Sequence, residues 1–253
     1  MTLVLRRLAA AIVLLLAMVR VTESAGRVDP RLHFRRIRTA HFTIYFHQGG
    51  DALAARLARV AEDVWATVPR RLGLSAPAHT HVVLADQSDL ANGWAVPLPF
   101  NTVLLHAAIP SGAERIGRVT DWLRIVFTHE FTHIVHLDRS DGWAKGVRRV
   151  FGRIPLAFPN LFLPEWMIEG LATYEESMTP GEVRLAAGDF RAIERTAAEA
   201  GRLPPLDRIN GGLVAWPSQE TPYAFGLGFH EFLVTRSGET ALGALAHGTA
   251  GRL

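Results

Sequence analysis

The segment from His129 to His133, His-Glu-Phe-Thr-His, constrains this chain more than any other feature, because it has the form H-E-x-x-H. It lies inside a run, beginning at residue 121, whose pattern predicts a buried helix. Residues four apart share one face of a helix, so both imidazoles are able to bind a single Zn²⁺ ion. Glu130 projects about 100° around the helix from His129, which suits it to hold a water molecule rather than the metal. The pattern predicts a site that makes a nucleophile from water near neutral pH.

Glu169 is the candidate third ligand, since a catalytic zinc site usually has three protein ligands and one open position. It lies in a second predicted helix, residues 163–176, where Pro164 suits the first turn. Its neighbours are apolar, so burial of this carboxylate is costly unless a cation meets it. The alternative is an exposed carboxylate, or one paired with arginine. We predict one zinc ion per chain, bound by the histidine pair and Glu169, and we expect Gly170 to let the two site helices approach closely.

The two motifs together resemble those of the gluzincin metallopeptidases, in particular the peptidase MA-like group related to the aminopeptidase N and thermolysin folds. The matching positions are His129, Glu130, His133, Trp166, Glu169, Gly170, Ala172 and Tyr174. The interval between His133 and Glu169 is longer than in the best-known gluzincins and is similar to that of bacterial MA-like proteins with a Pro-rich insertion. The resemblance covers roughly residues 39–233. It implies an α+β, zincin-like fold, in which an N-terminal lobe with a mixed sheet precedes a mainly helical lobe and the zinc site lies between them.

The resemblance also implies roles for two further side chains. Glu130 would polarise the water and later pass its proton to the leaving amine. Tyr223 and Gly226 match a Tyr-x-x-Gly helix whose phenol, in related enzymes, hydrogen-bonds the oxyanion. A donor is useful there because negative charge develops on the carbonyl oxygen in the transition state. The alternative for Tyr223 is that it packs its helix against the core, and both interpretations stay open.

Other polar residues near these motifs are not expected to bind the zinc ion: His136 is expected to be structural or to support a metal ligand. His136 is on the same stripe as His129 but about 10 Å further along the axis, so the two cannot share a metal. Asp138 is predicted to be a surface carboxylate, with a hydrogen bond to an imidazole as the alternative. His79 and His81 alternate along an apparent strand. We expect this pair to be solvated because no third ligand is near.

The N-terminus has the layout of a secretory signal peptide. Arg6 and Arg7 precede an unbroken apolar run, residues 8–19, which is short for a membrane span. We predict a signal peptide over residues 1–25, with an uncleaved membrane anchor as the alternative. The chain has no cysteine, which excludes lipoprotein attachment and disulfides. Export without disulfides suits a bacterial periplasmic or secreted protein.

The length of 253 residues permits a substantial core. We expect a zincin-like domain over residues 26–253, with a β-rich part over about 39–110 and a helical part over about 118–253. A β-propeller often follows in similar MA-like proteins, and no propeller repeat is present, so we expect either a C-terminally truncated fragment or a compact variant. The net charge is only +3, and the basic residues 35–38 and 145–149 lack interleaved aromatics. No nucleic-acid partner is expected.

Local patterns predict several elements. Residues 41–47, 80–85 and 101–106 are typical of strands, and Asp51 is expected to cap a helix that ends before Gly73. In the resembling enzymes an extended substrate adds to an edge strand that precedes the zinc helix. We assign that edge to Val103–Leu105, with a buried ordinary strand as the alternative. Residues 143–164 are predicted to form a covering loop, and the alternative is a membrane-touching loop behind the basic residues 148 and 149.

These observations predict an exported zinc-dependent peptidase that acts on peptides or proteins. Aminopeptidases of the related fold carry an acidic residue on the edge-strand segment, whereas residues 92–102 contain none. An endopeptidase is therefore favoured. The alternative is a catalytically inactive MA-like binding or scaffold protein of the cell envelope. Membrane contact is expected only through the N-terminal segment or residues 143–164.

Overall fold

The computed structural model describes residues 29–110, 121–179, 188–210 and 215–252. The chain divides into two units, Met1–Leu32 and His33–Leu253, and the second unit contains every strand and helix named below. The predicted signal peptide, residues 1–25, lies outside the described residues. Among those described, no helix combines the length and apolarity needed to cross a membrane.

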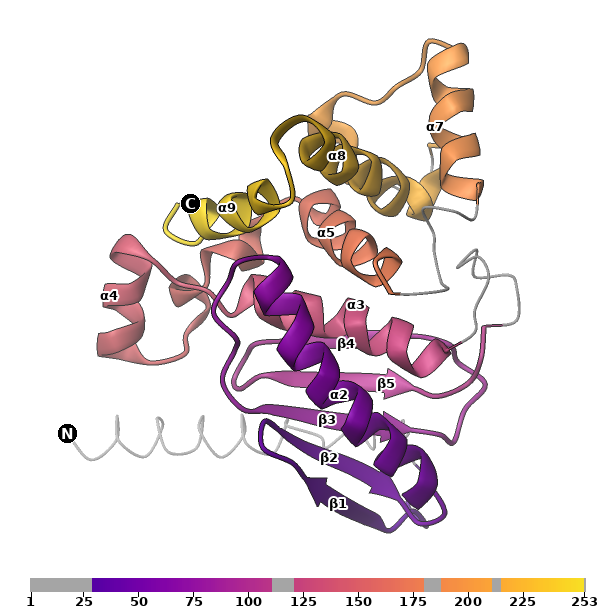
Figure 1. The fold of residues 1–253 in the computed structure, drawn as a ribbon, viewed down its shortest axis with the longest axis vertical. Coiled ribbons are helices and arrows are strands. Elements are labelled where there is room, and N and C mark those ends of the chain that lie inside the picture. Colours follow the sequence, from indigo (N-terminus) through magenta and orange to yellow (C-terminus); the bar gives the residue numbers. More distant parts are fainter. Residues whose placement is uncertain (1–28, 111–120, 180–187, 211–214, 253) are drawn as a thin grey trace, which may run out of the picture. The chain divides into compact units, whose positions relative to one another are not determined.

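Five strands form one mixed sheet in the spatial order β1, β2, β3, β5, β4 (Figure 1). The parallel centre consists of β2, β3 and β5, and the antiparallel edges are β1 and β4. The strands are β1 (Phe34–Arg38), β2 (Phe42–His47), β3 (Thr80–Ala85), β4 (Gly93–Val96) and β5 (Thr102–His106). Alternation in β2 buries Phe42, Ile44 and Phe46 against the helices that cover one face of the sheet. The core therefore lies between that face and the helices.

Seven α-helices are present among the described residues, which confirms the predicted α+β class. They are α2 (Asp51–Arg71), α3 (Trp122–Leu137), α4 (Gly142–Phe151), α5 (Glu165–Ser177), α7 (Asp189–Glu199), α8 (Thr221–Ser237) and α9 (Thr240–Thr249). Short 3₁₀ helices follow α4 and precede α8: η1 (Pro155–Ala157), η2 (Pro159–Phe162), η3 (Leu206–Arg208) and η4 (Ser218–Glu220). Helices α2 and α3 lie along the sheet, and α5 and α8 pack beyond α3 (Figure 1).

The assignment of the sheet edge to Val103–Leu105 is wrong. Strand β5 lies between β3 and β4, and the side chains of Val103 and Leu105 are fully buried. The edge next to α3 is β4, whose four residues include Gly93 and Trp94. So short a strand carries little alternating signal, whereas β5 is a clear apolar strand. The basic strand β1, at the opposite edge, was also not predicted as a strand, because charged side chains are tolerated at an edge but obscure the pattern.

Helix α2 was predicted almost to the residue, but its expected cap is wrong. Gly50 is the N-cap and Asp51 is the first helical residue. The carboxylate of Asp51 instead accepts a hydrogen bond from Arg35, at 3.2 Å. The N-cap of α3 is Asp121, a residue type that is favoured at this position. Its side chain accepts a hydrogen bond from the backbone N–H of Arg124.

Gly170 permits a close approach between two helices, but these are not the two site helices that the sequence predicted. A Cβ added at Gly170 would lie 2.4 Å from the backbone carbon of Gly226, and one added at Gly226 would lie 2.4 Å from the oxygen of Trp166. The contact is therefore between α5 and α8 rather than between α5 and the H-E-x-x-H helix. It brings the backbones of two helices together and so fixes where α8 presents its side chains.

The covering-loop prediction for residues 143–164 is wrong over its first half. This segment forms α4, η1 and η2, and in α4 the only buried residue is Ala144. Further on, Phe158 is fully buried beneath the guanidinium groups of Arg148 and Arg153, which lie 4.7 and 4.9 Å from its ring centroid. The segment thus has one anchored end and one exposed helix.

His230 makes the stability of the fold depend on pH. Its Nδ1–H donates to the oxygen of Gly226 at 2.7 Å, and burial lowers the pKa of His230 to about 4. Below the ordinary pKa of about 6.5, His230 binds a proton in the unfolded chain but stays neutral in the folded chain. Folded-state stability is therefore lost as the pH falls from about 6.5 to about 4.

We expect the free energy of unfolding to fall less steeply with decreasing pH in His230→Gln than in the wild type. Between pH 6 and pH 5 the difference should be about 1 kcal/mol, since one group contributes up to about 1.4 kcal/mol per pH unit. Urea unfolding at the two pH values measures it. Equal losses in both proteins would show that His230 is not held neutral.

Candidate metal centre

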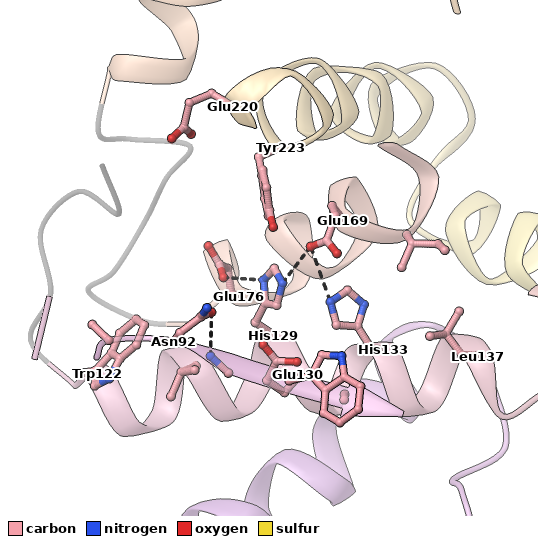
Figure 2. A pocket seen from close by; sticks show the side chains of 16 residues that line it. Asn92, Trp122, His129, Glu130, His133, Leu137, Glu169, Glu176, Glu220 and Tyr223 are labelled. Atoms are coloured by element: carbon pink, nitrogen blue, oxygen red, sulfur yellow. Dashed lines mark hydrogen bonds and ion pairs between the residues drawn. The ribbon is translucent and has the colours of Figure 1, made fainter. Parts of the chain in front are cut away.

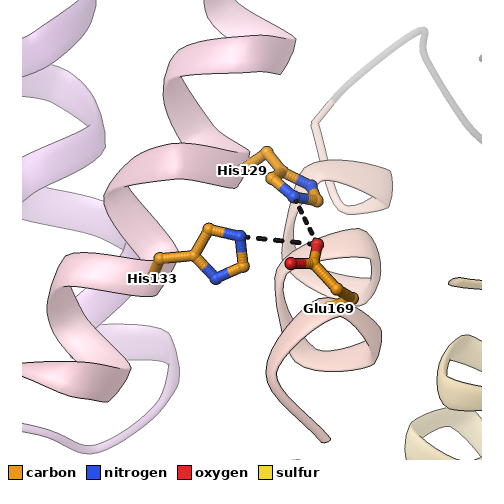
Figure 3. Close-up of side chains that lie close together, drawn as sticks. All are labelled: His129, His133 and Glu169. Atoms are coloured by element: carbon orange, nitrogen blue, oxygen red, sulfur yellow. Dashed lines mark hydrogen bonds and ion pairs between the residues drawn. The ribbon is translucent and has the colours of Figure 1, made fainter. Parts of the chain in front are cut away.

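Three potential ligand atoms converge from two helices. His129 and His133, one turn apart on α3, are buried, and Glu169 reaches them from α5 (Figure 2). Oε2 of Glu169 lies 3.1 Å from Nε2 of His129 and 3.5 Å from Nε2 of His133 (Figure 3). One ligand atom from each of the three residues falls within 4.8 Å of the others. This group could hold a metal ion, as the sequence predicted.

The charges around the site favour a cation between these three side chains. Burial alone would lower the pKa of His129, but the carboxylates of Glu176 and Glu169 outweigh it and raise the pKa to about 10. Burial likewise opposes ionisation of Glu169, yet His133 and His129 hold the pKa of its carboxyl well below the ordinary range. A positive charge is thus stabilised at the imidazoles, and a bound metal cation is able to supply it in place of a proton.

Glu176 was not predicted from the sequence. It lies two turns after Glu169 on α5, is buried, and its Oε2 accepts a hydrogen bond from Nδ1 of His129 at 2.8 Å. This bond fixes the tautomer of His129 whose Nε2 faces Glu169. Nδ1 of His133 has no such partner among the described residues. The seven-residue spacing within Glu169–Glu176 was a usable signal, because such residues share a helix face.

We expect Glu176→Gln to weaken metal binding about 10- to 100-fold, the usual cost of losing a carboxylate that orients a ligating histidine. Competition with a chromophoric zinc chelator measures the affinity. Glu165→Gln on the same helix is the matched control, since Glu165 is exposed and makes no bond to His129. Equal affinities in the two variants would contradict the role given to Glu176.

A pocket of about 470 Å³ opens over the ligand group. Residues of β4, α3, α5 and the start of α8 line it, and its described lining includes no lysine or arginine. Figure 2 shows the Tyr223 phenol directed toward His129 and Glu169, and the rings of Tyr223 and His129 lie 6.4 Å apart. Glu220, also in the lining, contributes a carboxylate that residues 92–102 lack.

Glu130 lies beneath the edge strand at the floor of this pocket. It is buried, and burial raises the pKa of its carboxyl above the ordinary value, although His129 and His133 oppose the shift. A Cβ added at Gly93 on β4 would lie 2.5 Å from Cγ and 2.6 Å from Oε1 of Glu130. Only glycine at this position lets β4 pass so close to the carboxylate.

The remaining polar candidates do not join the ligand group. His136 is buried and has its pKa lowered by burial to about 3, consistent with a structural role. Nε2 of His79 is 2.8 Å from the hydroxyl of Thr43, and Nδ1 of His81 is 3.1 Å from that of Tyr45. These two histidines are half-buried or exposed, and no further ligand joins them among the described residues.

The prediction that Asp138 is a surface carboxylate is wrong. Its side chain is 3 % exposed and accepts bonds from Arg148 at 2.7 Å, Arg153 at 3.0 Å and Asn101 at 2.7 Å. No imidazole is among these partners. The residue ties the end of α3 to α4 and to the loop before β5, contacts that local sequence could not reveal.

In comparisons with known proteins, no family model and no curated protein matches the chain.

Proposed function

We propose that this chain is an exported zinc-dependent peptidase of the gluzincin type. The observation that carries the proposal is the convergence of His129, His133 and Glu169 in a pocket that also contains the buried carboxylate of Glu130. The resemblance of the motifs supports the same assignment. Export rests on the charged and apolar layout of residues 6–19.

The donor set fits zinc. Two neutral imidazole nitrogens and one carboxylate oxygen are ligands that catalytic zinc sites use, and three protein ligands leave a position open. The pocket above the group offers space for water and substrate. When bound, Zn²⁺ supplies a Lewis acid that makes water more acidic and polarises a carbonyl group. The two imidazole nitrogens favour zinc over the hard cations Mg²⁺ and Ca²⁺, which prefer oxygen ligands.

Glu130 is the proposed base. Its Oε atoms take a proton from the attacking water and later deliver it to the nitrogen of the leaving amine, so that the carboxylate is regenerated. Burial and the nearby carboxylates of Glu169 and Glu176 make it a stronger base than an exposed glutamate. The Tyr223 phenol O–H is the proposed donor to the carbonyl oxygen as negative charge develops on it.

Strand β4 is the proposed binding edge for an extended peptide. Among the described strands it pairs with β5 alone, so its other side offers backbone groups for an added strand, and its residues line the pocket. Main-chain pairing accepts many side-chain sequences. An endopeptidase is the favoured form because β4 carries no acidic residue to hold a free amine. In the described lining, Glu220 is the one carboxylate outside α3 and α5. Because a carboxylate is able to hold a free amine, peptides with blocked and with free N-termini must be compared.

Cleavage of internally quenched peptides by the full chain with Zn²⁺ tests the proposal. We expect hydrolysis that stops when the metal is chelated and resumes when zinc is restored, with internal bonds cut in N-terminally blocked peptides. Hydrolysis only of free N-termini would indicate an aminopeptidase. Zinc binding without any hydrolysis would favour the inactive binding protein.

Gly93→Ala should impair the reaction without loss of metal. The added Cβ meets Glu130, a side chain able to rotate away, and not the ligands. We expect kcat to fall at least about ten-fold, because small misplacement of a catalytic group is costly. Zinc content and the unfolding midpoint should remain near wild type. Unchanged kcat would show that β4 does not position Glu130.

A further inference from the structure

Helix α4 exposes its large apolar side chains instead of burying them. Trp143 is 44 % exposed, Val150 is 73 % and Phe151 is 67 %, while Ala144 is the only buried residue of the helix. In η1, which packs against α4, Leu156 is 55 % exposed. Exposed apolar residues scattered singly are ordinary, but a group on one short segment marks an interaction surface. We call these residues, with Val147, the α4 surface.

The helix separates apolar from basic side chains. At about 100° per residue, Trp143, Val147, Val150 and Phe151 fall within an arc of about 100°. Lys145, Arg148 and Arg149 occupy the rest of the circumference, and the helix contains no acidic residue. This is the pattern of a basic amphipathic helix.

Two of the basic residues remain available to a partner. Arg148 is committed to Asp138, as described above. Lys145 and Arg149 are exposed, and neither forms an ion pair within the part of the chain that the structure describes. Helix α4 therefore carries the exposed apolar side chains of the α4 surface together with two unneutralised cations, and it contains no acidic residue.

We propose that the α4 surface docks on an anionic lipid bilayer. Apolar side chains of α4 insert at the boundary between headgroups and acyl chains, while Lys145 and Arg149 contact lipid phosphates. A helix of ten residues is about 15 Å long, half the hydrocarbon thickness, so it lies in the interface and does not span it. The single sign of its charge favours an anionic surface over a second copy of α4, which would carry the same charge. The proposal does not depend on peptidase activity.

The chain contains no cysteine, so one introduced cysteine is the single thiol that a fluorescent label reacts with. Val150→Cys in the full chain is labelled with a polarity-sensitive fluorophore, and Ala198→Cys, exposed on α7, is the matched control. Vesicles of phosphatidylcholine with added phosphatidylglycerol should shift the emission of the first probe to the blue and leave the second unchanged. Vesicles of phosphatidylcholine alone should have much less effect. No shift at position 150 with the anionic vesicles would overturn the proposal.

Charge variants separate α4 from the apolar N-terminal residues 8–19, which every variant retains. Each basic side chain near an anionic leaflet strengthens binding about five-fold, so Lys145→Gln with Arg149→Gln should weaken vesicle binding by about 25-fold. Unchanged binding would assign the lipid contact to another segment and overturn the proposal. A shift at position 150 that grows with protein concentration without vesicles would identify a self-association surface and also overturn it.

Discussion

Replacing Glu130 by Gln is expected to lower kcat for peptide hydrolysis by about 10³-fold or more. The amide keeps the size of the side chain but cannot accept and return a proton at neutral pH. Because Glu130 is not one of the three converging ligands, the zinc content should stay that of the wild type. Single-turnover cleavage of a quenched peptide, with the metal content of the same sample, measures both quantities.

The control for this change is Glu199→Gln, which makes the same substitution at an exposed position on α7. It should retain wild-type activity. Activity of Glu130→Gln within ten-fold of the wild type would exclude Glu130 as the base. Loss of both activity and zinc would instead show that Glu130 supports the metal, and the ligand assignment would have to change.

Replacing Gly170 by Ala should destabilise the protein by about 3 kcal/mol, the upper part of the range for overpacking a tight contact. The added methyl group would meet the backbone of Gly226, which cannot rotate aside as a side chain can. Relief therefore requires α5 and α8 to move apart. Chemical unfolding of the two proteins measures the difference.

Gly146→Ala supplies a control of opposite sign. Gly146 is also helical, but an added Cβ meets nothing within 4 Å, so alanine should stabilise the protein by about 0.5–1 kcal/mol. Equal effects of the two substitutions would show that the α5–α8 contact is not tight in solution. A separated α8 should also raise KM, because Tyr223 and Glu220 enter the pocket from its start.

The central part of the site could be predicted from the sequence because its signals are local. The four-residue spacing of His129 and His133 places both on one helix face. The carboxylate of Glu169 has apolar neighbours, and its burial is costly unless a cation lies close to it. The strands β2 and β3 were predictable for the same reason, since alternation and β-branched residues are read within six positions.

The features that were missed depend on contacts between distant segments. Strand β4 is an edge only because β5 inserts beside β3, and no pattern within residues 93–96 shows this. Asp138 is buried because Arg148 and Arg153 fold back onto it. The expectation for Gly170 recognised a close approach but chose the wrong helix, because sequence spacing does not identify the partner. Exposure of the α4 segment was only the alternative interpretation, because local sequence does not show which segments pack against it.

The zinc content of the purified full chain after equilibrium dialysis against Zn²⁺ tests the central claim most directly. Wild-type protein should retain one zinc ion per chain, and Glu169→Ala should retain little while keeping the circular dichroism of a folded protein. Equal zinc in both proteins, or none in the folded wild type, would contradict a metal centre formed by His129, His133 and Glu169.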